Sequence, residues 1–370
     1  MVETKAKRLL IVQRVLTKYR YELLKELSPF FSSVTIATSA GDGQGTLRLY
    51  RPQQVEYRNV NIKVLPALKL GYSGDVRSTT VFLYPAVLLQ VFRHDVLLLE
   101  GTTNVLNNLF IVPLAKLLGK KIIWWDSGSS QMVRTPRRKV IDFVMGILIM
   151  LTDAQIAYSQ KGRRYMSEYM HAGNCHCLLN AINTSYFEGI REEVNHVADT
   201  RETNSQQIRL LYVGVVEKRK MVRELIDMVS ALNRAGTRTY MLDIVGGGSE
   251  YEPLIKYVEE NSIRHVKLLG PKYAYEELKP HYFAADIFVL PGDGGLAVLQ
   301  SVLFGLPVLT VHADGTEEDY LPPECIFSSL GEIQEALLRM EPVKRLRSSD
   351  AARFYHINWI TGFVELSNQC

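Results

Sequence analysis

Apolar and polar residues alternate along the first half of the chain as short apolar runs and longer amphipathic stretches. The runs "RLLIVQ" (8–13), "SVTIAT" (33–38), "DVLLLE" (95–100) and "KKIIWWD" (120–126) are almost continuously apolar. Such runs are typical of parallel strands that are buried on both faces. The stretches between them, such as "NVLNNLFIVPLAKLLG" (104–119), have the length and spacing of helices. The first half is therefore predicted to be an α/β unit with a doubly wound parallel sheet.

The same alternation restarts in the second half, after a polar stretch. Residues 188–207, "EGIREEVNHVADTRETNSQQ", show little apolar periodicity, and we interpret them as a connection between domains. Strand-like runs then follow at 208–215, 239–248, 265–270 and 286–291, each separated from the next by a helix-like stretch. A second doubly wound unit is therefore predicted, and ligands of such sheets bind beyond the carboxyl ends of the strands.

These patterns predict two Rossmann-like domains that face a cleft. The predicted boundaries are 1–187 for the first domain, 188–208 for the connection, 209–350 for the second domain and 351–370 for a final helix. The final helix has Trp359 on its apolar side, and it either packs on the second domain or returns to the first.

Length and composition agree with this organisation. The chain has 370 residues, which is long enough for two domains that each have a hydrophobic core. A formal net charge of +4 is too small to indicate nucleic acid as the main partner. The basic start is followed by only a short apolar run, which indicates a first buried strand and no signal peptide. The apolar stretch 140–154 is shorter than the roughly 20 residues that a spanning helix needs.

The four cysteines are scattered, as expected for a protein of a reducing compartment, and we predict a cytoplasmic location. Cys175, His176 and Cys177 in "NCHC" have neither the usual zinc spacing nor a second pair of ligands. No metal site is predicted.

The stretch "LPGDGGLAVLQSVLFGLPVLT" (290–310) is the first candidate binding site. A glycine-rich turn, Gly292–Gly295, separates a strand from a helix that begins near Leu296. Glycines let backbone N–H groups approach an anion, and a helix N-terminus favours negative charge, so a phosphate is the natural occupant. Alternatively, the glycines serve only the tight turn.

Two further turns of the second half carry candidate chemistry. In "VGVVEKRKM" (213–221) a strand ends at Gly214, and a cationic run follows at a helix start, where an anion would compensate it. A solvated basic turn is the alternative. In "IVGGGSE" (244–250) a dinucleotide fingerprint would need its third glycine at position 251, where Tyr251 stands. This argues against a nicotinamide cofactor.

Together these stretches, with "LDIVGGGSEYEPLIKYVEENSIRHVKLLGPKYAYEELKPHYFAADIFVLPG", resemble the donor-binding domain of GT-B glycosyltransferases of the retaining family-4 group, glycosyl transferases group 1. "TDAQIAYSQKGRRYM", "NAINTSYFEG" and "QRVLTKYRYELLKEL" are similar to parts of the acceptor domain of its bacterial polysaccharide members. The resemblance implies transfer from a nucleotide-diphosphate sugar, with retention and without a metal. It also implies that the final helix returns to the first domain.

The resemblance implies specific donor contacts, together with departures from the family pattern. Lys220 matches the lysine that contacts the diphosphate and stabilises its departure. Val215 stands where an arginine is usual, and the two family glutamates fall on Gly292 and Gln300. The donor-binding residues expected on this basis are Gly214, Arg219, Lys220, Gly246, Asp293, Gly294, Gly295, Leu296 and Gln300.

The first domain is expected to bind the acceptor. Asp126 ends a predicted strand and is the candidate catalytic carboxylate, unless it only caps the following segment. Glu100 ends an equivalent strand. Arg14, Tyr19 and Arg20 lie in the first loop, where they meet an anionic acceptor or are simply solvated.

The expected acceptor is a saccharide or lipid-linked saccharide in cell-surface polysaccharide biosynthesis. "RTPRRKVIDFVMGILIM" (134–150) joins basic residues to an apolar helix, which suits either an anionic membrane face or a buried core helix. Two other functions stay open: a non-catalytic sugar-nucleotide-binding or scaffold protein, and a sugar-nucleotide epimerase of the same fold.

Overall fold

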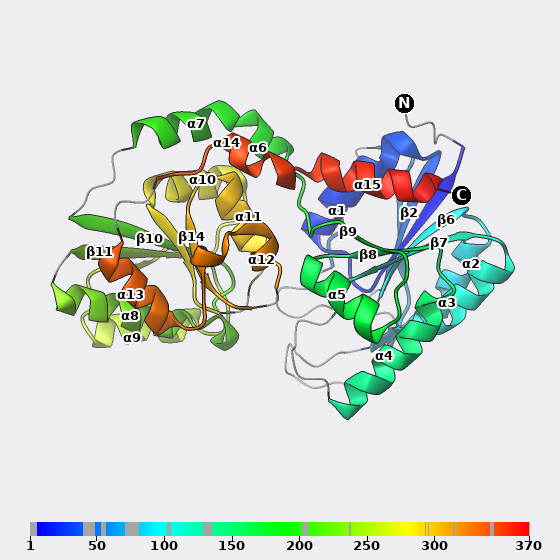
Figure 1. Ribbon diagram of the computed structural model, residues 1–370, viewed down its shortest axis with the longest axis horizontal. Coiled ribbons are helices and arrows are strands. Elements are labelled where there is room, and N and C mark those ends of the chain that lie inside the picture. Colours follow the sequence, from blue (N-terminus) through cyan, green and yellow to red (C-terminus); the bar gives the residue numbers. More distant parts are fainter. Residues whose placement is uncertain are drawn as a thin grey trace. The chain divides into compact units, whose positions relative to one another are not determined.

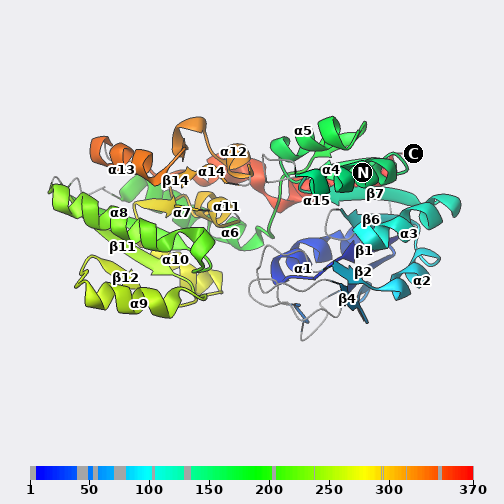
Figure 2. The same cartoon turned by 90° about the horizontal axis from the view of Figure 1, so that it is seen from below.

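The chain folds into two compact units, residues 1–183 with 356–370 and residues 184–355. The computed structural model describes residues 6–39, 49–52, 57–70, 81–101, 105–128, 135–201, 206–236, 238–292, 294, 296–313, 315–340 and 344–369. Figures 1 and 2 show a twisted sheet with helices on both faces in each unit.

Unit 1 is built on a seven-stranded parallel sheet in the order β3-β2-β1-β6-β7-β8-β9, with a separate antiparallel pair, β4-β5. Its strands are β1 (Arg8–Gln13), β2 (Ser33–Ser39), β3 (Val60–Leu65), β4 (Leu68–Leu70), β5 (Val81–Leu83), β6 (Val96–Glu100), β7 (Lys121–Asp126), β8 (Ala154–Ala157) and β9 (Cys175–Cys177). Its helices are α1 (Lys18–Leu24), η1 (Lys25–Phe30), η2 (Pro85–Val87), α2 (Leu88–Val91), α3 (Val105–Leu117), α4 (Pro136–Ile149), α5 (Gln160–Tyr169) and α15 (His356–Asn368), where η marks a 3₁₀ helix.

The sheet of unit 1 has a hydrophobic core on each face, because successive side chains of a strand point to opposite faces. Trp124 packs with residues of α2, α3, α4 and α5 on one face. Its neighbour Trp125 packs with residues of α1 and α15 on the other. The near-continuous apolar strands predicted from the sequence are thus explained by two covered faces, which confirms the α/β prediction.

The final helix belongs to unit 1. Trp359 of α15 is 3% exposed, and its ring centroid lies 5.1 Å from that of Trp125. The Nζ of Lys7 also donates a hydrogen bond to the carbonyl of Ser367. The expected return of this helix to the first domain is therefore observed.

Unit 2 is built on a six-stranded parallel sheet in the order β12-β11-β10-β13-β14-β15. Its strands are β10 (Gln207–Val213), β11 (Thr239–Val245), β12 (Val266–Leu268), β13 (Ile287–Leu290), β14 (Val308–Val311) and β15 (Ile326–Phe327). Its helices are α6 (Ser185–Gly189), α7 (Arg191–Thr200), η4 (Lys218–Lys220), α8 (Val222–Ala235), α9 (Tyr251–Glu260), α10 (Tyr275–Ala284), α11 (Leu296–Leu303), α12 (Glu317–Tyr320), η5 (Pro323–Cys325), α13 (Leu330–Arg339), α14 (Ser348–Ala351) and η6 (Ala352–Phe354).

Residues 188–208, predicted as a polar connection, are largely helical and belong to unit 2. Ile190 and Val194 are buried, and the side-chain oxygen of Asn195 accepts hydrogen bonds from both the backbone N–H and the hydroxyl of Ser348. Tertiary contacts therefore hold α7, although most of its residues are polar. The signal that sequence analysis missed is the helical spacing of Ile190, Val194 and Val197.

Candidate functional site

The loops that follow β10 and β11 are joined by backbone hydrogen bonds at the carboxyl edge of the unit 2 sheet. The N–H of Gly214 donates to the carbonyl of Val245, and the N–H of Val216 donates to that of Gly247. A Cβ at Gly246 would lie 1.8 Å from the carbonyl oxygen of Gly214. A glycine is therefore required at position 246 for this close approach, and Gly246 lies directly against the predicted donor-binding residue Gly214.

The glycine turn after β13 packs against η4, which carries the predicted diphosphate-binding cations. The Nζ of Lys220 donates a 2.8 Å hydrogen bond to the carbonyl of Gly294, and the Lys220 side chain is buried. A Cβ at Gly292 would lie 2.6 Å from the backbone oxygen of Arg219 and 2.8 Å from the carbonyl carbon of Lys220. Two turns that sequence analysis considered separately therefore form one structure.

This packing gives Gly292 a role that sequence analysis missed. The resemblance placed a lost family glutamate at this position, yet no side chain fits there unless the backbone of η4 moves. The missed signal is the glycine itself, since glycine is common where two backbone segments approach closely.

The end of η4 has an uncommon backbone conformation. Met221 has φ 53° and ψ 36°, in the left-handed region that residues other than glycine rarely adopt. Arg219 lies two residues earlier and pairs with Glu217, with 2.8 Å between Nε and Oε2. Beneath this loop the hydroxyl of Tyr212 donates to the carbonyl of Val215, and burial raises the pKa of Tyr212, so the phenol stays protonated. The Arg219–Glu217 ion pair and the Tyr212–Val215 hydrogen bond thus stabilise the segment that contains η4.

Helix α11 begins immediately after the glycine turn, and Leu296 is its first residue. Leu296 and Gln300 are half-buried and lie one helical turn apart, whereas Val298 and Leu299 are buried. The Gln300 side chain has no hydrogen-bond partner among the described residues. Asp293 and Gly295, also predicted to bind the donor, lie outside the residues that the structure describes.

Three residues with metal-ligating side chains come together where the loop after β14 meets α12. Ligand atoms of His312, Glu317 and Glu318 all lie within 4.8 Å of one another. The buried Glu317 carboxylate already accepts hydrogen bonds from the backbone N–H groups of Ala313 and Gly315, at 2.7 and 2.9 Å. These bonds give Glu317 a structural role in shaping the loop.

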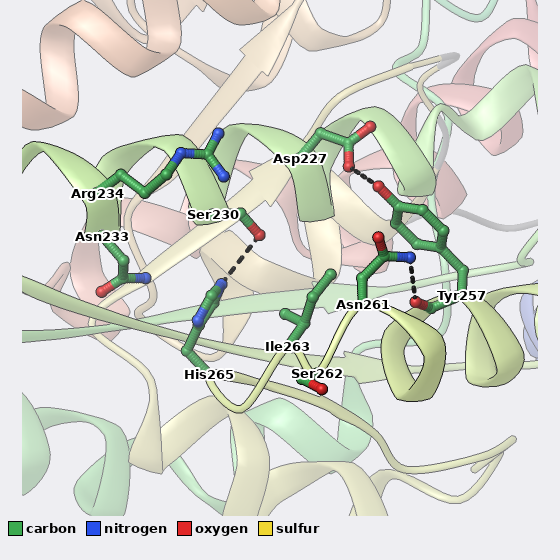
Figure 3. A pocket seen from close by; sticks show the side chains of 9 residues that line it. All are labelled: Asp227, Ser230, Asn233, Arg234, Tyr257, Asn261, Ser262, Ile263 and His265. Atoms are coloured by element: carbon green, nitrogen blue, oxygen red, sulfur yellow. Dashed lines mark hydrogen bonds between the residues drawn. The ribbon is translucent and has the colours of Figure 1, made fainter.

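A pocket of about 480 Å³ lies between α8, the end of α9 and the loop before β12 (Figure 3). Four of its polar side chains form two pairs: the hydroxyl of Tyr257 donates to Asp227, and the Oγ of Ser230 lies 3.1 Å from Nε2 of His265. Because His265 directly precedes β12, the pocket lies at the amino ends of the strands. It is therefore separate from the loops around Lys220.

Carboxylates end two neighbouring strands of the unit 1 sheet, as predicted. Oε2 of Glu100 accepts a hydrogen bond from the backbone N–H of Arg14. Asp126 is 2% exposed, and its two oxygens accept hydrogen bonds from the N–H of Gly128 at 3.0 Å and from Nε1 of Trp124 at 3.3 Å. The bond to Gly128 agrees with the alternative reading of Asp126 as a cap of the segment that follows.

Arg20 and Tyr19 were expected in the first loop, but the structure places both on α1, where Arg20 is buried. It is 6% exposed, its guanidinium lies 4.0 Å from the ring centroid of Trp125 and 4.8 Å from that of Tyr158, and its Nε donates to the Tyr19 hydroxyl. Burial alone would lower the pKa of Arg20, but Tyr158, Tyr19 and the Glu100 carboxylate raise it above its ordinary value. Arg20 therefore stays charged among aromatic rings.

Nη1 of Arg20 and Nε1 of Trp125, the ring against which it packs, are buried and have no hydrogen-bond partner among the described residues. The same holds for Nε2 of Gln13, which ends β1, and for Oγ1 of Thr17, which directly precedes α1. Buried polar groups are normally satisfied, so such a group of exceptions marks a place where a polar ligand or water binds. Sequence analysis identified Arg20 but missed Gln13, Trp125 and Tyr158.

Two other sequence features have structural explanations. Cys175 and Cys177 lie on the opposite side of β9 from His176, since side chains alternate along a strand, so the three cannot converge on one metal. Burial raises the pKa of Cys175 to about 11. Arg138, one of the basic residues of the stretch 134–150, pairs with the buried Asp142 at 2.7 Å. This contact agrees with the core-helix alternative for Arg138, and the membrane-face alternative stays a prediction.

Most of unit 2 matches the model of a known protein family. Residues 198–321 match the model described as "Glycosyl transferases group 1". Unit 2 contains a group 1 glycosyltransferase domain. For this domain the predicted family resemblance and the enzyme class, a glycosyltransferase, are confirmed by the match.

Solved structures show the same fold for the whole chain. HepE of Anabaena in complex with UDP aligns with a TM-score of 0.66 at 14% identity, over 97% of this chain and 99% of that chain. The lipopolysaccharide outer core galactosyltransferase WaaB aligns with a TM-score of 0.66 at 14% identity, over 97% and 98%. A glycosyltransferase from Rickettsia africae aligns with a TM-score of 0.63 at 12% identity, over 98% of each chain. The predicted GT-B architecture is thereby confirmed. No curated protein matches the chain in sequence.

Proposed function

We propose that this group 1 glycosyltransferase moves a sugar from a nucleotide-diphosphate sugar to a saccharide or lipid-linked saccharide, with retention, in cell-surface polysaccharide biosynthesis. The reaction would take place on the cytoplasmic side of a membrane. The observation that carries the proposal is the bond between Lys220 and the glycine turn, because it brings a buried cation to a turn that precedes a helix N-terminus.

The donor diphosphate would bind where these two features meet. An ammonium group has three N–H donors, and the first N–H groups of a helix have no partner within the helix. Lys220 and the backbone amides of Gly294 and Leu296 would hold the phosphates, with Arg219 nearby on η4. Gln300, one turn along α11, would offer its amide oxygen to a ribose hydroxyl. The same donors would stabilise the charge that develops on the departing diphosphate.

The acceptor would bind at the carboxyl edge of the unit 1 sheet. The charged Arg20 and the unpaired atoms of Gln13 and Thr17 favour an acceptor that presents a phosphate or carboxylate together with hydroxyl groups. A diphosphate-linked lipid saccharide has both. Tyr19 directly precedes Arg20, Arg14 lies earlier in the same segment, and Glu100 lies within electrostatic reach of Arg20.

In the transfer step the acceptor hydroxyl oxygen forms a bond to the anomeric carbon of the donor sugar. The bond from that carbon to the phosphate oxygen breaks, and its electron pair leaves with the nucleoside diphosphate. The hydroxyl proton passes to the leaving phosphate or to a carboxylate, for which Asp126 is the candidate. No metal or other cofactor is needed to balance this step.

A thermal-shift screen of nucleotide-diphosphate sugars, beginning with UDP-glucose, tests the donor. A ligand that binds only the folded protein raises the melting temperature. The stabilising donor is then incubated with a diphosphate-linked lipid saccharide, and nucleoside diphosphate release and glycosylated product are measured. We expect both products in equal amounts. Stabilisation without either product would favour the non-catalytic alternative, and a changed nucleotide sugar without acceptor would favour an epimerase.

A further inference from the structure

Helices α2, α3 and α4 of unit 1 are apolar on the side that faces solvent as well as on the side that faces the sheet. Ten of the fourteen large apolar side chains that are exposed among the described residues lie on these helices or directly after them. We call this group the α2–α4 surface. It consists of Leu89, Phe92, Leu109, Phe110, Leu117, Leu118, Val140, Phe143, Ile147 and Met150.

The exposed residues of α4 form a continuous stripe. Val140, Phe143, Ile147 and Met150 follow the spacing i, i+3, i+7, i+10, which places them on one side of a helix. Phe143 is 68% exposed and Met150 is 63% exposed. The opposite side of α4, which includes Met145, is buried in the core of unit 1. The core therefore does not account for the outward stripe.

The three helices are neighbours, so their exposed residues make one surface. Helix α3 contacts both α2 and α4, as Figures 1 and 2 also show. On α3, Phe110 is 58% exposed and Leu117 is 84% exposed. Monomeric soluble proteins rarely expose large contiguous apolar patches, and such patches mark interaction surfaces.

The exposed charged side chains described on α3 and α4 are basic. Asp142 is the only acidic residue in α2, α3 and α4, and it is fully buried beside Arg138. Lys116 and Lys139 are exposed on α3 and α4, and the exposed Arg93 follows α2. Asp153, which follows α4, lies 3.6 Å from the ammonium of Lys116. The α2–α4 surface is therefore apolar with a basic border.

We propose that the α2–α4 surface docks on an anionic lipid bilayer. Its apolar side chains would enter the boundary between headgroups and acyl chains, and Lys116, Lys139 and Arg93 would meet anionic headgroups. Among the described residues no helix is both long and apolar enough to cross a bilayer, so docking is interfacial. Charge distinguishes this occupant from a second copy of the chain, because two such surfaces would bring like charges together.

Vesicle co-sedimentation of the full chain tests the proposal without any sugar substrate, so its outcome is independent of the proposed transfer. The vesicles contain phosphatidylcholine alone or with about one-third phosphatidylglycerol. We expect binding to the anionic vesicles at low salt and a weaker interaction at 0.5 M salt, since salt screens exposed charges. The triple variant Phe110→Ser, Leu117→Ser, Phe143→Ser should bind at least about tenfold more weakly. Sedimentation velocity and circular dichroism check that the variant stays folded.

A matched control changes exposed apolar residues of unit 1 that lie outside the α2–α4 surface. Leu68 is 63% exposed and Ile357 is 50% exposed, and Leu68→Ser with Ile357→Ser should bind vesicles as the parent does. Arg93→Glu with Lys139→Glu should reduce binding to anionic vesicles only. Equal binding by the parent and the triple variant would overturn the proposal. The proposal would also be overturned if the parent did not bind vesicles but formed a dimer that the triple variant does not form.

Discussion

The two candidate sites of this protein both lie at the carboxyl ends of sheet strands, but one is formed by backbone and the other by side chains. In unit 2 the loops after β10, β11 and β13 approach one another through glycine backbone, and Lys220 bonds to a carbonyl of the glycine turn. In unit 1 the site is made of side chains: Arg20 of α1 packs against Trp125 of β7, and Glu100 and Asp126 end β6 and β7. One site is defined by backbone geometry and the other by side-chain chemistry.

This difference indicates what each site recognises. Backbone amides and one cation suit a diphosphate, which every nucleotide-diphosphate sugar contains. A charged guanidinium with an unpaired N–H among aromatic rings suits one particular acceptor group. Added side-chain volume should therefore damage the donor site, and altered charge should damage the acceptor site. Four variants test this comparison, in order of decreasing expected effect.

Gly292→Ala should have the largest effect. The added methyl carbon would lie 2.6 Å from the backbone oxygen of Arg219, so the glycine turn must move away from η4. Overpacking of this kind costs about 1–3 kcal/mol, and misplacing a reacting group by about 1 Å costs about a hundredfold in rate. We expect transfer to fall by about a hundredfold, as measured by initial rates at saturating acceptor.

Gly247→Ala is the matched control for Gly292→Ala. A Cβ at Gly247 would meet Pro271 at 3.5 Å, an ordinary van der Waals contact. The control should keep the parent rate and melting temperature. If Gly292→Ala also kept both, the close packing of the glycine turn on η4 would be wrong.

Lys220→Ala should reduce transfer by about tenfold or more, equivalent to at least about 1.4 kcal/mol. Because the buried Lys220 bonds to the carbonyl of Gly294, some loss of stability is expected as well. Calorimetry with UDP and with uridine separates the two effects, because only UDP carries the diphosphate. Lys256→Ala, an exposed site on α9, is the control. Equal loss of UDP and uridine binding would remove Lys220 from the phosphate site.

The strands and the candidate turns could be predicted from the sequence, because each is marked by residues that are close together in the chain. The strands appear as apolar runs because both faces of each sheet are covered, and the candidate turns appear because glycine and lysine lie within a few residues of strand ends. The contacts of Arg20 with Trp125 and Tyr158 could not be predicted, because parallel topology brings together residues more than 100 positions apart. The packing of Gly292 could not be predicted for the same reason, because η4, which it contacts, is far from it in the sequence.

Arg20→Gln should raise the KM for a diphosphate-linked acceptor by about five- to tenfold and leave the Kd for UDP unchanged. The change removes a charge that otherwise makes charge-assisted hydrogen bonds, at a site in unit 1. Arg20→Lys keeps the charge without the planar fork and should recover part of the loss. Lys18→Gln on the exposed side of α1 is the control. A change in UDP binding, or equal KM for neutral and anionic acceptors in the parent, would contradict an anion-binding role.

Gln300→Leu should have the smallest effect, and it tests whether the donor site extends along α11 beyond the backbone. The amide oxygen of Gln300 is proposed to accept a hydrogen bond from a ribose hydroxyl, and leucine would leave that hydroxyl without a partner. An unmet buried polar group costs about 1–3 kcal/mol. Because Gln300 is half-buried, we expect the lower end, about fivefold weaker UDP binding by calorimetry. Gln300→Glu keeps the acceptor oxygen and should bind UDP at least as well as the parent, since a charged acceptor forms a stronger hydrogen bond. If leucine and glutamine bound UDP equally in equally stable proteins, Gln300 would not contact the nucleotide, and recognition in unit 2 would rest on the glycine turn and Lys220.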